Sequence, residues 1–146
     1  MFLGTINHTL DTKGRLIIPQ KYRTQLGEDL VIAMGQDGCL NLYPRAAWED
    51  SIRFLKDLVT FNDANAREVY RFYMGGADDT IEMDKQGRIL IPASHRAFAR
   101  LDKELVLVGV GDFIEIWDRH IYETEHTFQN ISSISRQITL PGSREV

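Results

Sequence analysis

One pattern of ten residues occurs twice in this chain, and it restricts the fold more than any other feature does. The pattern reads apolar, Asp, two polar residues, Gly, Arg, three apolar residues and Pro, at Leu10–Pro19 and again 73 positions later at Met83–Pro92. With offsets of 73 to 75 the correspondence continues through Arg23 and Arg96, Leu30–Ile32 and Leu105–Leu107, Leu40–Tyr43 and Ile114–Trp117, and Arg45 and Arg119. Such a repeat is too long for a solenoid unit and fits a duplicated small domain. Duplicated units tend to pair, and a pair presents its loops as a two-fold set.

The bulk properties indicate one compact soluble body built from two half-domains. The chain has 146 residues, of which 43% are hydrophobic and 26% charged, which is ordinary for a globular protein. No apolar run approaches the roughly 18 residues of a membrane helix, and Met1–Thr9 has no signal-peptide pattern. The single cysteine, Cys39, cannot form an internal disulfide, which fits a reducing cytoplasm, and we expect it to be a buried, inert thiol.

Basic residues gather around both copies of the pattern although the whole chain is acidic. The net charge is −4, yet Asp11 to Arg23 holds four basic residues and one acid, and so does Asp84 to Arg100. The rest of the chain therefore carries a net charge of −10. An acidic body with basic patches is compatible with local binding of a polyanion.

The first unit reads as short strands with a helix between them. Alternation of polar and apolar residues, glycine turns and prolines mark the ends of the elements. We expect strands over residues 5–10, 16–18, 30–34 and 40–43, and helices over 20–26, 44–59 and 63–74.

The second unit repeats this order. We expect strands over residues 80–83, 89–91, 105–108 and 113–117, and helices over 94–101 and 119–130. Asp118 is placed to cap the last helix. The polar residues that follow, 131–146, are expected to fray.

An Asp and an Arg stand four residues apart across each glycine turn. A carboxylate in this position can accept hydrogen bonds from the turn backbone while the guanidinium folds back or points outward. On their own, Asp11 with Arg15 and Asp84 with Arg88 could be purely structural staples. The surrounding basic patch favours a binding role, because such a patch repels itself unless an anion uses it.

The doubled motif resembles the AbrB/SpoVT-type swapped-hairpin DNA-binding domains, and the duplicated arrangement, with its Met1–Gly4 start, resembles the MraZ family. The resemblance covers roughly residues 1–130. It implies an α+β, mainly β fold, in which two AbrB-like swapped-hairpin half-domains form one pseudo-two-fold barrel with flanking helices. The domain boundaries that it implies are a first SpoVT/AbrB-like unit with its following helix over 1–60, a connecting helix over 61–76, a second such unit with its helix over 77–130, and a flexible tail over 131–146.

The resemblance also implies a function. Members of this family are transcriptional regulators, generally repressors, of the bacterial division and cell-wall gene cluster; they bind tandem promoter repeats and assemble into rings. The implied partners are double-stranded promoter DNA and further copies of the chain, in the cytoplasm at the nucleoid, with no membrane, small-molecule substrate, metal or cofactor. The implied DNA-binding residues are Lys13, Arg15, Lys85, Arg88, Lys21, Arg23 and Arg96. The residues that would orient the turns are Asp11, Gly14, Asp84 and Gly87.

The physical reading of these residues supports DNA binding in two ways. Lysines and arginines on phosphates give affinity that falls steeply with salt, and Arg15 or Arg88 is the best candidate for a bidentate contact to guanine. Asp11 and Asp84 are expected to orient those arginines rather than touch DNA. Helices over 45–59 and 63–74 carry apolar surface that we expect to contribute to a subunit contact.

Other functional classes have less support. The four histidines His8, His95, His120 and His126 form no zinc motif, and the chain holds no Gly-x-Ser-x-Gly. An enzyme is therefore the least expected class. Two alternatives stay open: an AbrB-type antitoxin-like regulator, against which the absence of a long acidic tail speaks, and an oligomeric scaffold whose basic turns dock a protein or an RNA.

Overall fold

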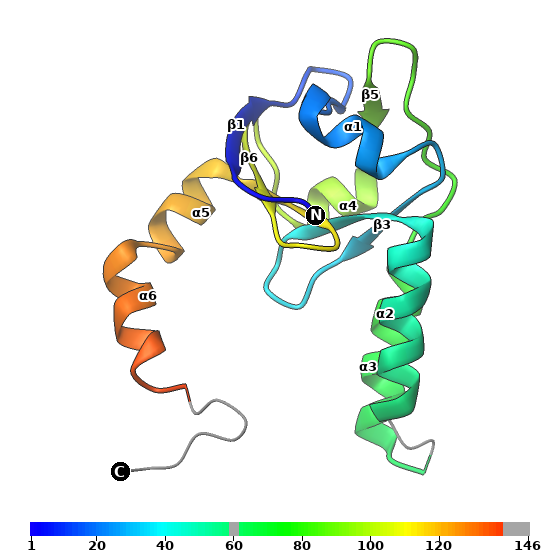
Figure 1. Ribbon diagram of the computed structural model, residues 1–146, viewed down its shortest axis with the longest axis vertical. Helices are drawn as coiled ribbons and strands as arrows, with labels where there is room; N and C mark the ends of the chain where they lie inside the picture. Colours follow the sequence, from blue (N-terminus) through cyan, green and yellow to red (C-terminus); the bar gives the residue numbers. More distant parts are fainter. Residues whose placement is uncertain (59–61, 139–146) are drawn as a thin grey trace.

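Two similar sets of elements follow one another along the chain. The computed structural model describes residues 1–58 and 62–138 (Figure 1). The first set consists of β1 Thr5–Thr9, β2 Arg15–Ile17, α1 Gln20–Leu26, β3 Leu30–Met34, β4 Leu40–Pro44, α2 Arg45–Leu58 and α3 Ala64–Gly75. The second set consists of β5 Arg88–Leu90, α4 Ala93–Phe98, β6 Glu104–Gly109, β7 Ile114–Asp118, α5 Arg119–Glu125 and α6 Phe128–Ser135. The order of elements thus repeats, as the duplicated sequence predicts.

Strand pairs join the two units as well as neighbouring strands within each unit: β1–β6, β4–β7 and β2–β5 connect the units, while β3–β4 and β6–β7 lie within one. One antiparallel sheet has the order β1-β6-β7-β4-β3, and β2 and β5 form a separate two-stranded antiparallel ribbon. The first strand of the first unit therefore lies against β6 of the second unit. In the reverse direction, Asp78 of the second unit bridges to Ile32 on β3. Each unit thereby pairs its first segment with a strand of the other unit instead of with one of its own.

A pseudo-two-fold axis relates the two units. In the ribbon, Leu16 lies directly opposite Ile89, which is its own counterpart in the repeat. In the large sheet, Asn41 lies opposite its counterpart Glu115. A residue can face its own counterpart only on the symmetry axis, so the axis passes through both pairs.

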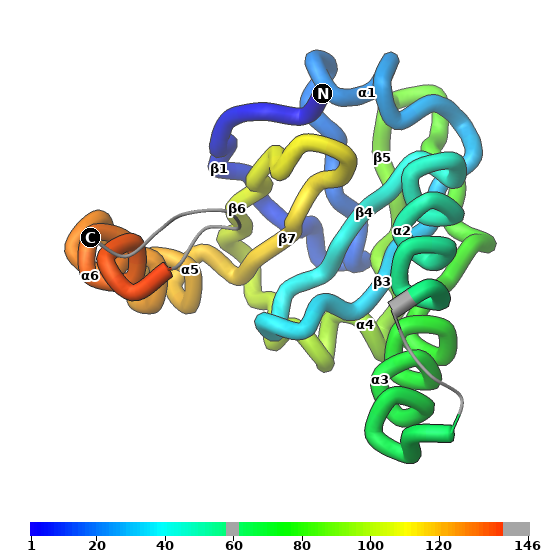
Figure 2. Tube along the Cα trace, turned by 60° about the horizontal axis from the view of Figure 1, so that its bottom comes forward, coloured from blue at the N-terminus to red at the C-terminus, as the bar shows by residue number. Residues whose placement is uncertain are grey.

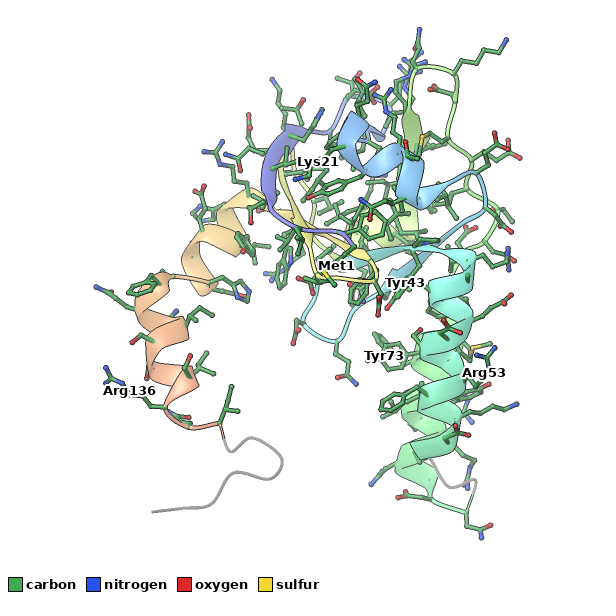
Figure 3. The ribbon with its side chains drawn as sticks, viewed as in Figure 1. Met1, Lys21, Tyr43, Arg53, Tyr73 and Arg136 are labelled. Atoms are coloured by element: carbon green, nitrogen blue, oxygen red, sulfur yellow. The ribbon has the colours of Figure 1, made fainter. Side chains whose placement is uncertain are left out.

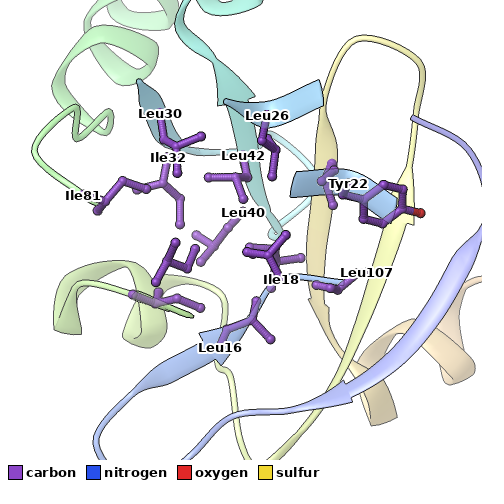
Figure 4. Close-up of a cluster of buried hydrophobic side chains, with 14 of the residues drawn as sticks. Leu16, Ile18, Tyr22, Leu26, Leu30, Ile32, Leu40, Leu42, Ile81 and Leu107 are labelled. Atoms are coloured by element: carbon purple, nitrogen blue, oxygen red, sulfur yellow. The ribbon is translucent and has the colours of Figure 1, made fainter. Parts of the chain in front are cut away.

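The main core lies between the ribbon and the large sheet. Leu16 and Ile89 are fully buried there, and they pack with apolar residues of β3, β4, β6 and β7. Figure 4 shows Leu16, Ile18 and Leu40 of the first unit in one cluster with Ile81 and Leu107 of the second. The inward side of the ribbon is therefore fixed, and its other side faces away from the core.

Two helical segments extend from opposite sides of this body. Figures 1 and 2 show α2 and α3 side by side at one edge and α5 followed by α6 at the other. Tyr43, Trp48 and Ile52 pack α2 onto the sheet in a second, smaller core. Among the described residues, no helix combines the length and apolar character needed to cross a membrane.

The fold expectation is correct in class and wrong in two details. The protein is α+β with two half-domains, but it is not mainly β, because more of the described residues lie in helices than in strands. The described strands also form two separate sheets instead of a closed barrel. The three-residue strands β2 and β5 pair with each other, and beyond one isolated bridge from Leu16 to Leu10 they make no strand pair with the large sheet among the described residues.

Two local predictions are also wrong. Thr80–Met83 forms no strand, since the Asp78 carboxylate accepts hydrogen bonds from Thr80 N at 2.7 Å and Thr80 Oγ1 at 2.6 Å, which turns the chain away from β3 after one bridge. The helix expected over 119–130 is two helices. Asp118 caps α5 as predicted, but Thr127 Oγ1 accepts from Asn130 N at 3.1 Å and starts α6 anew.

Candidate nucleic-acid interface

The first glycine turn is organised by one carboxylate. Asp11 Oδ1 accepts hydrogen bonds from Lys13 N at 2.9 Å and Arg15 N at 2.8 Å. Its second oxygen, Oδ2, accepts from Arg15 Nε at 2.7 Å. The Arg15 N–H bond is the largest of the effects that hold the pKa of Asp11 below its ordinary value.

The second turn reproduces this geometry. Asp84 Oδ1 accepts from Gln86 N and Arg88 N, each at 2.9 Å, and Oδ2 accepts from Arg88 Nε at 2.8 Å. The Arg88 N–H bond likewise lowers the pKa of Asp84. Both carboxylates are therefore ionised at neutral pH and occupied by the turn itself.

This arrangement leaves the outer end of each guanidinium available. Asp11 and Asp84 bind only the Nε atoms of Arg15 and Arg88. The Nη1 and Nη2 atoms make no hydrogen bond to the described parts of the chain. Two N–H groups side by side at the end of a held guanidinium suit a bidentate acceptor, either a phosphate or the O6 and N7 atoms of guanine.

The β2–β5 ribbon brings both arginines to one surface. Arg15 lies opposite Leu90, and Ile17 lies opposite Arg88. Because side chains alternate along a strand and Leu16 and Ile89 point into the core, all four of these residues belong to the outward face. The two turns stand at opposite ends of this face, roughly 13 Å apart for four residues of extended chain.

Each turn is covered by an arginine from the other unit. Gly14 has a φ of +83° and Gly87 a φ of +80°, both in the left-handed region that favours glycine. A Cβ on Gly14 would lie 2.6 Å from Arg96 Cζ, and a Cβ on Gly87 would lie 2.6 Å from Arg23 Nη2. The glycines thus permit both the turn and the close approach of an arginine, so each end of the ribbon is built from both units.

The two covering arginines differ in one hydrogen bond. Arg23 Nε donates to the carbonyl of Ile18 at 2.8 Å, which fixes its path over Gly87. Arg96 Nε is buried without a hydrogen-bond partner in the described part of the protein. The pseudo-symmetry of the site is therefore approximate.

Six of the seven basic residues singled out in the sequence fall into two groups. Lys13, Arg15 and Arg96 gather at one end of the ribbon, and Lys85, Arg88 and Arg23 at the other. Lys21 lies apart from both, with its Nζ 5.1 Å from the centre of the Tyr22 ring and next to Gly4 (Figure 3). The two positive ends lie about one ribbon length apart, so that one can contact a phosphate on one side of a DNA groove and the other a phosphate on the opposite side.

The sequence pattern does not predict that Ile17 and Leu90 are exposed on the surface of the ribbon. Each sits in a triplet of apolar residues that reads as a fully buried strand, yet Ile17 is 42% exposed and Leu90 55% exposed. The signal that could have indicated this exposure is the alternation of inward and outward side chains around Leu16 and Ile89. It can be recognised only once β2 and β5 are known to form a ribbon with one covered side.

The described residues offer little for other chemistry. They contain no group of three or more His, Cys, Asp and Glu side chains able to hold a metal ion. Cys39 is buried, and burial together with the nearby Glu115 carboxylate raises the pKa of its thiol. An uncharged, covered thiol is a poor nucleophile.

Comparisons with known proteins cover both repeats. The sequence matches the family described as "MraZ protein, putative antitoxin-like" over residues 1–71 and 74–138. It is 45% identical over 135 residues to the transcriptional regulator MraZ of Lachnoclostridium phytofermentans, covering 92% of this chain and 93% of that protein. For the proteins of the same name from Moorella thermoacetica and Acetivibrio thermocellus, identity is 48% over 123 residues and 39% over 144 residues. The first match covers 84% of this chain and 85% of that relative, and the second covers 97% and 99%. The similarity therefore extends over nearly the whole length of the chain and of its relatives.

Proposed function

This chain belongs to the MraZ family, and we propose that it is a sequence-specific DNA-binding transcriptional regulator that uses the outward face of the β2–β5 ribbon to read DNA. The relatives are named as regulators and not as enzymes, and the proposed function needs no catalytic group. It places the protein in the cytoplasm, on the nucleoid.

The observation that carries this proposal is the pair of held arginines on a two-stranded ribbon. The major groove of B-DNA admits such a ribbon, and a bidentate arginine on guanine is the most frequent specific contact there. Arg15 and Arg88 are fixed at Nε by Asp11 and Asp84, so their free ends lose little rotational freedom on binding. Base reading thus falls to Arg15 and Arg88.

The surrounding cations supply affinity. Lys13 and Lys85 are exposed on the two turns, and Arg23 and Arg96 cover the same turns from the opposite units. These residues stand where the phosphates on both sides of the groove would run, so binding should weaken steeply with salt. Lys21 is a weaker candidate because its ammonium group lies over Tyr22, away from the ribbon.

Further copies of the chain would multiply these contacts. We propose a homo-oligomer, in the form of a ring, that faces tandem repeats in the promoter of the division and cell-wall gene cluster and represses it. Exposed apolar side chains support assembly: Phe54 on α2 is 67% exposed and Phe128 on α6 is 85% exposed. A groove of about 520 Å³ beside Phe54, lined by Tyr43 and Phe113, adds apolar surface on that edge. Several subunits on one DNA would bind far more tightly than one subunit through multivalency.

Binding to labelled promoter DNA tests the proposal. Fluorescence anisotropy would compare a tandem-repeat duplex from the promoter of this gene cluster with a scrambled duplex, across a salt series, for wild type, Arg15→Ala and Arg88→Ala. We expect selective, salt-sensitive binding that both variants lose while circular dichroism shows them folded. Lys21→Ala serves as the matched control and should retain most of the affinity.

The same experiment separates the alternatives. Equal weak binding to both duplexes, unchanged in the variants, would return the Asp–Arg pairs to structural staples and favour a scaffold for a protein or an RNA. Selective DNA binding together with co-purification of a small toxic partner would indicate an antitoxin-like regulator. Light scattering on the same sample gives the mass, and a monomer at micromolar concentration would contradict the ring.

A further inference from the structure

The two aliphatic side chains on the outward face of the ribbon have no role in the proposal so far. We infer that Ile17 and Leu90 contact thymine methyl groups in the major groove, next to the bases that Arg15 and Arg88 read. This inference rests on the proposed function and adds a statement about the bases of the operator. Ile17 and Leu90 thereby become specificity-determining residues.

The exposure of both side chains is a paired feature of the fold. Ile17 and Leu90 occupy the same position in the two repeats, one residue after the buried Leu16 and Ile89. One exposed aliphatic residue on a surface is ordinary, whereas here the same position is exposed in both units and on the same face. Core packing does not require them, because the core uses the opposite side of the ribbon.

Their distance from the arginines is short. Ile91 N donates to Gly14 O at 3.0 Å and Ile18 N to Gly87 O at 2.8 Å, which makes Arg15 with Leu90, and Ile17 with Arg88, the non-hydrogen-bonded pairs of the ribbon. In such pairs the Cα atoms are only about 4.5 Å apart and the side chains are closest. Each arginine therefore has an aliphatic residue directly across the ribbon.

The chemistry of the groove selects the contact. The thymine 5-methyl group is the only alkyl group among the base edges of the major groove, where the other bases present mainly hydrogen-bond donors and acceptors. An isoleucine or leucine pressed onto a donor or acceptor would desolvate it without a replacement bond. Beside a methyl group the same side chain excludes water from two apolar surfaces at once. Thymine is thus the base that these residues favour.

The positions of the turns set the order of the contacts. Asp11 draws the Arg15 guanidinium back toward the turn at one end, and Asp84 draws that of Arg88 toward the other end. The aliphatic side chains lie between them along the ribbon. One subunit is accordingly expected to read two methyl groups on the inside and two guanines on the outside, related by the pseudo-two-fold axis through Leu16 and Ile89.

Replacing thymine by uracil removes only the methyl group and leaves every hydrogen-bonding atom in place. The test measures anisotropy of the fluorescein-labelled tandem-repeat promoter duplex with either thymine or uracil throughout the repeats. It uses the full-length protein as wild type, Leu90→Ala, Ile17→Ala and the double variant. Leu3→Ala is the matched control, since Leu3 is 60% exposed and belongs to neither the ribbon nor the turns.

Wild type should bind the uracil duplex more weakly by roughly fourfold for each methyl contacted, the change expected for burial of one such group, and thus by about sixteenfold for each subunit bound. Each single variant should keep only the roughly fourfold preference of its remaining contact for each subunit bound, and the double variant should bind both duplexes equally. Leu3→Ala should discriminate as wild type does.

Failure of this inference is distinguishable from failure of the proposed function. If wild type binds the repeats selectively through Arg15 and Arg88 but treats thymine and uracil alike, the methyl contacts do not exist and the regulator remains. A thymine preference that survives in the folded double variant would likewise refute the role of Ile17 and Leu90. Absence of any selective DNA binding would overturn both.

Discussion

The close fit of an arginine over each glycine turn can be measured as a stability difference, and Gly87→Ala is the sharpest way to do so. Gly87 has a φ of +80°, and the position of its missing Cβ lies 2.6 Å from Arg23 Nη2. An added methyl group would therefore strain the backbone and also displace a side chain that belongs to the other unit.

The two costs can be estimated separately. A non-glycine residue in the left-handed region costs about 1–2 kcal/mol. The guanidinium can move aside, but Arg23 Nε then loses its bond to the Ile18 carbonyl, which is 2.8 Å long and contributes about 1 kcal/mol. We expect Gly87→Ala to lower the free energy of unfolding by about 2–3 kcal/mol, which corresponds to a Tm lowered by roughly 4–10 °C.

Gly38→Ala isolates the backbone cost. Gly38 has a φ of +87°, and a Cβ there would have no heavy atom within 4 Å. Urea unfolding followed by circular dichroism should give about 1–2 kcal/mol for this variant. In an Arg23→Ala background, Gly87→Ala should cost no more than Gly38→Ala. Equal costs of the two glycine variants in the wild-type background would refute the argument that Arg23 is seated on the turn.

Three further predictions follow from the burial and charge of individual residues. Asp84→Asn should lower the Tm at pH 7. The difference from wild type should shrink as the pH falls through the lowered pKa of Asp84, because protonation then removes the same charge from the wild type. Thermal melts of both proteins at pH 7 and pH 2 check this. Leu16→Ala and Ile89→Ala should each lower the free energy of unfolding, measured in urea, by about 2–5 kcal/mol and by similar amounts, since both side chains are fully buried on the axis. A large difference between the two variants would contradict the two-fold arrangement. Cys39, which is 1% exposed, should resist a thiol reagent at pH 8 in the native protein and react once urea is added, whereas rapid labelling of native protein would contradict its burial.

The sequence was most informative where a local rule decides the structure. The turns at Gly14 and Gly87 follow from glycine's freedom at positive φ, and Asp118 caps α5 because a carboxylate before a helix satisfies its first N–H groups. The duplicated order of elements likewise follows from the repeat itself. These features depend on residues a few positions apart.

Features that depend on pairing between residues far apart in the chain could not be predicted from the sequence. The seating of Arg23 on Gly87 requires knowledge that β2 pairs with β5, and the outward position of Ile17 requires knowledge of which side of that ribbon is covered. Thr80–Met83 has a strand pattern, but competition from the Asp78 carboxylate for Thr80 prevents its pairing. In the first two cases a contact between the units decides the structure, and at Thr80 a hydrogen bond within the same unit outweighs the strand propensity.

The exchange of first segments between the units has a consequence for synthesis on the ribosome. Thr5 pairs with Val108, so the N-terminal strand cannot reach its place until most of the chain has been made. Contacts of such large sequence separation slow folding, and an unpaired strand edge is exposed in the meantime. The nascent first half is therefore expected to depend on chaperones, or on a second nascent copy that supplies the missing strand and so yields exchanged dimers.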